Sequence, residues 1–268
     1  MDNRPIGVFD SGVGGLTVLR EIISAVPDES IIYFGDTARF PYGPRDLAEV
    51  RHFAFKITEF LSNCEVKLIV VACNTSTAAA LEDLKREFDI PIIGVIEPGA
   101  RTAAGNTIKN KVGVIATKGT VASRDYEFAV KKINPAIDVY QVAAPLLVEY
   151  IERGILDGSD LKKLICEYVE PLNQYDIDVL ILGCTHFPII EGEIKSCCNE
   201  GIKVISSAVE TARDVRQVLG ANQIKSEKSL KPGRVFYETG DASKFLEISK
   251  IFLGTEIKEV KKIKLNMY

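Results

Sequence analysis

The hydrophobic pattern of the chain alternates between short apolar runs and longer stretches of helical periodicity. The clearest run, 68–72, has only apolar residues, as expected for a strand that is buried on both faces. The apolar runs predict strands at 6–9, 31–34, 68–72, 91–96, 111–116, 138–142, 179–182, 201–205 and 235–241, the last with a turn. Helical spacing predicts helices at 16–25, 46–63, 123–133, 147–153, 160–172, 208–219 and 244–252, and one that ends near 88. Strands that alternate with helices indicate an α/β protein.

One arrangement occurs in both halves of the chain. In each half a turn with hydroxyl groups follows the first strand, at Ser11 and at Thr117, and a cysteine follows a later strand. This repetition favours two pseudo-symmetric, doubly wound α/β domains, each with a mainly parallel central sheet and with the active site in the cleft between them. Proline and glycine at 97–100 interrupt the pattern and indicate a domain crossing. The predicted domains are 1–97 plus 207–268, and 98–206.

The two strand-end cysteines, Cys73 and Cys184, are the main candidates for chemistry. Ligands of parallel sheets bind beyond the carboxyl ends of the strands, where both thiols are expected. Two thiols across a small ligand suit proton transfer at carbon, with a base on one face and an acid on the other. An ordinary thiol pKa of about 8.5 allows either role, and a helix that starts after each cysteine is expected to favour the thiolate. The alternative for any single cysteine is a buried packing residue.

Other ionisable residues surround these thiols in the sequence. His186 lies two residues after Cys184 and could orient or protonate a substrate, or tune the thiol. The same pair also permits a nucleophilic Cys–His hydrolase. Asp10 and Asp36 each end a predicted strand and either point into the crevice or cap the following helix. Glu152 belongs to a predicted helix and is expected to face solvent.

The remaining motifs predict neither a cofactor nor a metal. The glycine-rich turn 10–15 suits an anion at a helix N-terminus, but its spacing does not match the dinucleotide-binding fingerprint. The adjacent Cys197 and Cys198 lack the spacing of a zinc pair, and no CxxC is present. We interpret Cys64 and Cys166 as small buried apolar residues and expect no disulfide.

Composition and charge narrow the class of protein further. Of the 268 residues, 46% are apolar and 26% charged, which suits a globular protein with a sizeable core. The net charge of −4 gives no indication of nucleic-acid binding, and the lysine-rich stretch 258–264 is expected to be a solvated edge. A strand begins near the N-terminus and no apolar run could span a bilayer, so we expect a cytoplasmic location.

Five motifs closely resemble those of the aspartate/glutamate racemase family, in the pattern of its glutamate racemases. They are VFDSGVGG at 8–15, YFGDT at 33–37, PYG at 41–43, ACNT at 72–75 and GCTH at 183–186. The match runs in order from Ile6 to about Arg213, so the last fifty or so residues carry no diagnostic motif. The resemblance implies a cofactor-independent isomerase that interconverts L- and D-glutamate and supplies D-glutamate for peptidoglycan.

The resemblance also implies roles for residues of this sequence. Cys73 and Cys184 would be the two acid/base groups. The catalytic set is completed by Asp10, His186, Asp36 and Glu152. The implied substrate-binding set is Asp10, Ser11, Pro41, Tyr42, Gly43, Cys73, Asn74, Thr75, Thr117, Thr120, Thr185 and His186. The implied partners are glutamate and a second copy of the chain in a homodimer, with no nucleic acid and no membrane.

Three other functions remain open at this point. Aspartate racemase would use the same two thiols on a side chain one methylene shorter, a difference worth only about 1–3 kcal/mol in a binding site. A Cys–His hydrolase would use Cys184 and His186 and leave Cys73 dispensable. A non-catalytic protein that binds small acids would turn nothing over and would keep its binding without either thiol.

Overall fold

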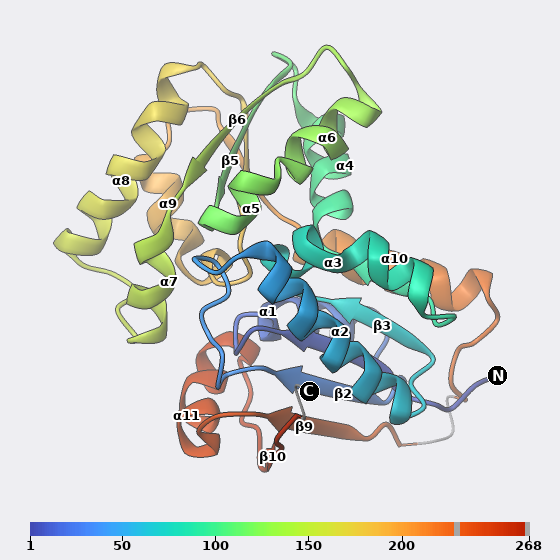
Figure 1. Cartoon of the computed structure of the whole chain (residues 1–268). Coiled ribbons are helices and arrows are strands. Elements are labelled where there is room, and N and C mark those ends of the chain that lie inside the picture. The colour runs from blue at the N-terminus through green and yellow to red at the C-terminus, as the bar shows by residue number, and fades with distance from the viewer. Residues whose placement is uncertain (228–230, 266–268) are drawn as a thin grey trace.

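Two parallel β-sheets, each covered by helices on both faces, form the protein (Figure 1). The computed structural model describes residues 1–227 and 231–265. Sheet A has the order β10 (Lys261–Lys262), β9 (Arg234–Glu238), β2 (Ile31–Gly35), β1 (Ile6–Asp10), β3 (Leu68–Val71) and β4 (Ile92–Gly94). Sheet B has the order β6 (Asp138–Ala143), β5 (Lys111–Ala116), β7 (Val179–Gly183) and β8 (Lys203–Ser206). All pairings among these strands are parallel.

The two sheets share one strand order, which confirms the predicted fold of two α/β domains. The order β2-β1-β3-β4 in sheet A corresponds to β6-β5-β7-β8 in sheet B. Strand β3 is therefore the counterpart of β7, and β1 the counterpart of β5. In each sheet the chain passes from the first strand, β1 or β5, to a neighbour on one side and then crosses to the neighbour on the other side. A crevice opens at this point of reversal, at the carboxyl ends of the central strands.

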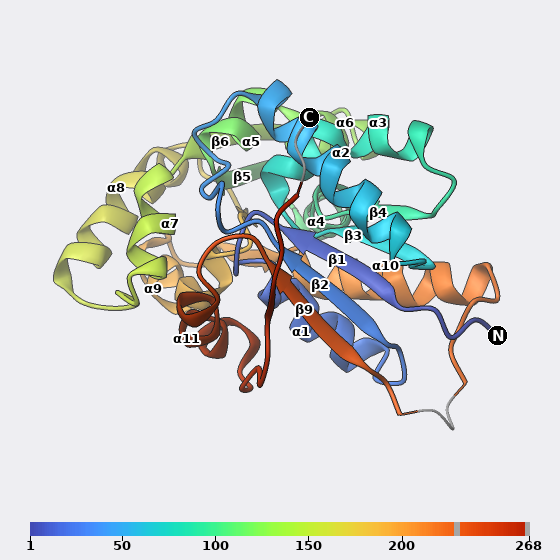
Figure 2. The same cartoon turned by 60° about the horizontal axis from the view of Figure 1, so that its bottom comes forward.

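Helices cover the sheets because alternate strand residues are apolar on both faces. On sheet A, Leu68 and Val70 pack toward one face, while Ile69 and Val71 pack toward the other. The first face carries α1 (Leu16–Ala25) and α10 (Ala208–Ala221), and the second carries α2 (Leu47–Asn63) and α3 (Asn74–Glu87) (Figure 2). On sheet B, α4 (Ile96–Asn106) and α6 (Asp125–Ile133) lie opposite α8 (Ser159–Gln174). The remaining helices are α5 (Lys118–Ser123), α7 (Pro145–Glu152), α9 (Glu191–Cys197), α11 (Ala242–Leu253) and the 3-10 helix η1 (Phe187–Ile190).

Most predicted elements are confirmed, with three local corrections. Residues 97–100 do not break the pattern: they belong to α4, where Pro98 lies in the first turn and needs no intrahelical partner for its nitrogen. The predicted strand 91–96 is therefore limited to β4. The predicted helix 123–133 is confirmed as α6 from Asp125 on, whereas the predicted turn before it is a separate helix, α5, with Arg124 in a left-handed conformation between the two. The predicted polar loop 223–232 lies partly outside the described residues.

The expectations for two cysteines outside the strand ends were also wrong. Cys166 of α8 forms a disulfide with Cys197 of α9, with an S–S distance of 2.00 Å. Neither Cys64 nor Cys166 is fully buried, so neither is a simple core residue. The linked residues are 31 positions apart, and spacing alone does not reveal that α8 and α9 pack together.

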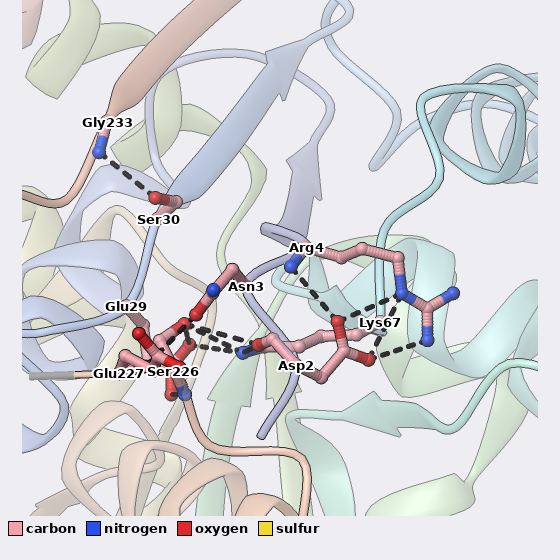
Figure 3. A network of polar contacts seen from close by, with 9 residues as sticks. All are labelled: Asp2, Asn3, Arg4, Glu29, Ser30, Lys67, Ser226, Glu227 and Gly233. Carbon is pink, nitrogen blue, oxygen red and sulfur yellow. Dashed lines mark hydrogen bonds and ion pairs between the residues drawn. The ribbon is translucent and has the colours of Figure 1, made fainter. Parts of the chain in front are cut away.

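A buried ion pair joins several segments at the edge of sheet A where the amino ends of its strands lie. Lys67 Nζ, at the start of β3, lies 2.5 Å from Glu29 Oε2, and both side chains are almost fully buried. Lys67 also donates to the backbone oxygen of Asp2 and to Ser226 Oγ, at 2.6 and 3.0 Å (Figure 3). Ser226 in turn donates to both oxygens of Glu29. One ammonium group thus joins the N-terminus, β3 and the segment after α10.

We predict that Lys67→Met destabilises the protein by about 3–5 kcal/mol, because it leaves the carboxylate of Glu29 buried without its cation. Urea denaturation followed by circular dichroism measures this change in the free energy of unfolding. Lys56→Met is the matched control, since the pair of Lys56 with Glu59 is partly exposed and should contribute less than about 1 kcal/mol. Equal effects of the two substitutions would contradict the prediction.

Candidate active site

A cavity of about 430 Å³ lies at the carboxyl ends of the strands of both sheets. The first half contributes predicted residues to its wall: Ser11, Pro41, Tyr42, Gly43, Cys73, Asn74 and Thr75. The second half contributes Thr117, Glu152, Cys184, Thr185 and His186. Three other predicted residues, Asp10, Asp36 and Thr120, are buried behind this wall and do not line the cavity. The structure therefore gathers residues far apart in the sequence around one space.

The two cysteines follow equivalent strands and face the same cavity. Cys73 lies two residues after the end of β3 and caps α3, where its sulfur accepts a hydrogen bond from the Ser76 N–H at 3.4 Å. Cys184 directly follows β7. Only 5% of Cys73 and 6% of Cys184 is exposed, so each thiol lines the cavity but is otherwise shielded from solvent. Two sulfurs at equivalent strand ends can approach the same carbon atom of a bound ligand from different sides.

The surroundings of the two thiols differ in charge. Burial, reinforced by the nearby carboxylate of Asp10, raises the pKa of Cys73 to about 12. Hydrogen bonds with Ser76, at the start of α3, oppose this shift, but desolvation outweighs them, so the helix start does not make Cys73 a thiolate as expected. Cys184 is followed by a turn and the 3-10 helix η1 rather than by an α-helix. The expectation of a helix start directly after Cys184 was therefore wrong as well. Cys184 instead lies beside an imidazole.

His186 connects Cys184 with an acidic residue. His186 Nδ1 is 3.8 Å from Cys184 Sγ, and His186 Nε2 is 3.1 Å from Glu152 Oε1. Burial disfavours the charged imidazolium, but the contacts with Cys184 and Glu152 outweigh it and raise the pKa of His186 to about 10. Glu152 is half-buried and lines the cavity, so the expectation that it faces solvent was wrong. The rings of Phe40 and Phe252 pack against the imidazole.

The glycine-rich turn after β1 brings the two halves close together. A Cβ atom on Gly14 would lie 2.4 Å from the imidazole of His186, so only glycine fits there. The Gly12 N–H donates to Asp10 Oδ2 at 3.0 Å. This N–H of the glycine-rich turn, which we expected to bind an anionic ligand, is therefore already paired with a carboxylate of the protein. Burial raises the pKa of Asp10, although the positive charge of His186 opposes the shift. Asp10 does not cap α1, whose cap makes no side-chain hydrogen bond.

Hydroxyl and amide groups join the two walls of the cavity. Thr75 Oγ1 and Thr117 Oγ1 lie 2.9 Å apart, and Thr117 also contacts Thr120 Oγ1 at 3.1 Å. The Tyr126 hydroxyl donates to Asn74 Oδ1 at 2.7 Å. This part of the wall offers uncharged donors and acceptors to a polar ligand. In the described part of the chain, no group of acidic, histidine or cysteine side chains could hold a metal ion.

Sequence reasoning missed several residues at the cavity. Phe40 and Pro44 lie in the irregular loop after β2, and Arg153 follows α7. Lys244 of α11 reaches the cavity from the C-terminal part of the chain, which carries no motif. No local pattern marks these positions, because their place depends on how distant elements pack. None of the helices within 1–227 and 231–265 is long and apolar enough to cross a membrane.

Curated relatives of high similarity cover almost the whole chain. The glutamate racemase of Oceanobacillus iheyensis is 48% identical over 249 residues, which cover 92% of this chain and 91% of the relative. The glutamate racemase of Corynebacterium diphtheriae is 44% identical over 264 residues, 98% of each chain. These similarities include the C-terminal part that lacks a diagnostic motif.

Solved structures agree with the fold described above. Glutamate racemase isoform RacE1 from Bacillus anthracis is 43% identical and matches with a TM-score of 0.95 over 99% of each chain. The glutamate racemase of Francisella tularensis, solved with D-glutamate, is 38% identical and matches with a TM-score of 0.94 over the full length of both chains. A sequence profile of the Asp/Glu/Hydantoin racemase family matches residues 6–215. This chain belongs to the Asp/Glu/Hydantoin racemase family.

Proposed function

We propose that the protein is an isomerase that interconverts L- and D-glutamate without a cofactor, by proton transfer between the α-carbon and two cysteines. The observation that carries the proposal is the pair of buried thiols, Cys73 and Cys184, at equivalent strand ends of one cavity. The D-glutamate would supply peptidoglycan synthesis. The similarity of this chain to glutamate racemases supports the choice of substrate.

The proposed reaction begins with an asymmetric pair of thiols. The cationic imidazole of His186 lies where it would balance the negative charge of the attacking thiolate at Cys184, whereas burial and Asp10 keep Cys73 protonated. The thiolate removes the α-proton from one face, and the electron pair of the broken C–H bond stays on the α-carbon. The opposite thiol then gives its proton to the other face, so the two cysteines exchange protonation states.

Binding in this proposal depends on uncharged groups. Ser11, Asn74, Thr75 and Thr185 line the cavity and offer hydroxyl and amide partners for the two carboxylates of glutamate. Neutral donors that are fixed before the substrate arrives can stabilise the charge that develops during deprotonation. Asp10, Asp36 and Thr120 would act from behind the wall, because they do not line the cavity.

Aspartate racemases are less similar to this chain than glutamate racemases are. The aspartate racemase of Picrophilus torridus is 19% identical with a TM-score of 0.57, which is a similarity of fold alone. A Cys–His hydrolase would use the contact between Cys184 and His186, but gives Cys73 no role at the cavity. We therefore favour glutamate racemisation over both alternatives.

We further propose a homodimer in the cytoplasm, and domain boundaries at 1–97 plus 207–268 and at 98–206. The family resemblance supports the first two. The boundaries agree with the membership of the sheets, because the strands of sheet A lie within 6–94 and 234–262 and those of sheet B within 111–206. Analytical ultracentrifugation tests the dimer.

We predict that L-glutamate incubated with the protein in D2O, without added cofactor, loses its α-proton signal and forms the D-isomer. Proton NMR follows the exchange, and chiral chromatography identifies the product. Exchange with aspartate but not glutamate would keep the mechanism and overturn the substrate. No exchange with either amino acid would overturn the proposed racemase.

Each of the single variants Cys73→Ala and Cys184→Ala is predicted to lower racemisation by at least about 10²–10⁴-fold, because each removes one acid/base group. Cys64→Ala is the control, since Cys64 is a free thiol at the end of α2 that does not line the cavity. Full activity of Cys73→Ala would contradict the two-thiol mechanism and favour the hydrolase.

The imidazole of His186 is predicted to titrate well above 6.5 in wild type and at lower pH in Glu152→Gln, which loses a charged partner. Because folding raises the pKa of His186 from 6.5 to about 10, its contribution to stability is complete below about pH 6.5 and is lost as the pH rises toward 10. Histidine-ring NMR measures the titration. Glu149→Gln, on the same helix and at the same cavity, is the control. An unchanged titration in Glu152→Gln would contradict the prediction.

A further inference from the structure

The loop after β2 contributes to the wall of the cavity and is held in part by the buried carboxylate of Asp36. Tyr42 and Gly43 of this loop line the cavity, and Tyr42 shares a small apolar cluster with Cys73. Asp36, which is fully buried, accepts a hydrogen bond from the Tyr42 hydroxyl through Oδ2. Its Oδ1 accepts from Arg39 Nη1 at 2.6 Å. The orientation of Asp36 therefore determines where the hydroxyl of Tyr42 lies.

The end of β9 supplies the remaining contacts of this loop. Thr239 Oγ1 donates to Asp36 Oδ1 at 2.7 Å and accepts from the Ala38 N–H at 3.0 Å. A hydroxyl has one proton to donate, so these two contacts fix its direction. Beside it, the carboxylate of Glu238 is fully buried and accepts from Thr37 Oγ1 at 2.7 Å. Thr239 thus holds both ends of the stretch from Asp36 to Ala38, and Glu238 holds Thr37 between them.

The segment after β9 and the loop after β2 approach so closely at Gly240 that a side chain would not fit there. A Cβ atom on Gly240 would lie 2.7 Å from Thr37 Oγ1, which explains the glycine after Thr239. On its other side the loop meets the second half of the protein, where Gly43 O accepts from the Gly119 N–H at 2.9 Å. A shift of the loop would therefore change the walls contributed by both halves.

We propose that Thr239 and Glu238 are positioning residues for substrate binding. They hold Asp36 and the loop, and through them the ring of Tyr42 and the backbone of Gly43, in the positions in which these two residues line the cavity. This inference rests on the proposed function. Neither residue lines the cavity, so both act only through the loop. The C-terminal strand, which carries no family motif, thereby sets the affinity of the site.

Thr239→Val tests the inference, because it keeps the shape of the side chain and removes its hydroxyl. The loop contacts substrate in the ground state and the transition state alike, so KM for both enantiomers should rise on the order of tenfold while kcat stays near the wild-type value. Thr239→Ser restores the hydroxyl and should restore KM. Thr37→Val removes the contact with Glu238 and should also raise KM. This second variant tests the inference if Thr239→Val does not fold.

Ser249→Ala is the matched control, since it removes another buried hydroxyl of the C-terminal part, one that donates within α11 to the Leu246 oxygen. Its KM should equal that of wild type. A fall in kcat with unchanged KM in Thr239→Val would indicate a merely structural role and overturn the inference, as would wild-type values of both constants. Absence of glutamate racemisation by the wild-type protein would instead overturn the proposed function itself.

Discussion

The parallel direction of every described strand pairing is the constraint on which the site depends. Parallel strands place all their carboxyl ends at one edge, and the two sheets of this protein share one strand order. The turns that follow β3 and β7 are therefore equivalent, and each contains a cysteine, Cys73 or Cys184. With the two edges facing one cavity, the repeated fold places two thiols at the same space, which is the arrangement that the proposed two-thiol racemisation needs.

Equivalent positions do not have equivalent environments. Cys73 lies near a buried carboxylate and is kept neutral, whereas Cys184 lies beside an imidazole that Glu152 helps to keep charged. The proposed racemisation needs one acid and one base at the same time, and the neutral Cys73 and the imidazolium beside Cys184 are consistent with that need. The charge around each thiol, rather than the thiols alone, thus distinguishes the site from two packing cysteines.

Local patterns predicted the strands and the two cysteines but not the contacts that complete the site. Strands such as 68–72 are buried on both faces, so their apolar runs are visible in the sequence. The start of α4, the disulfide of Cys166 and the inward position of Glu152 depend on tertiary packing, which no local pattern encodes. The contact of Thr239 with Asp36 spans 203 positions and lies beyond the last recognisable motif. Hydrophobic periodicity indicates which residues are buried, but the group that pairs with a buried polar side chain depends on the tertiary fold.

The most direct test of the two-thiol account is the early distribution of deuterium between product and recovered substrate in D2O. With separate bases on the two faces, D-glutamate formed from L-glutamate should carry deuterium at the α-carbon, while the remaining L-glutamate keeps its proton. The reverse reaction should behave in the same way. Equal deuterium in product and recovered substrate at low conversion would indicate that one base serves both faces, and would contradict the roles proposed for Cys73 and Cys184.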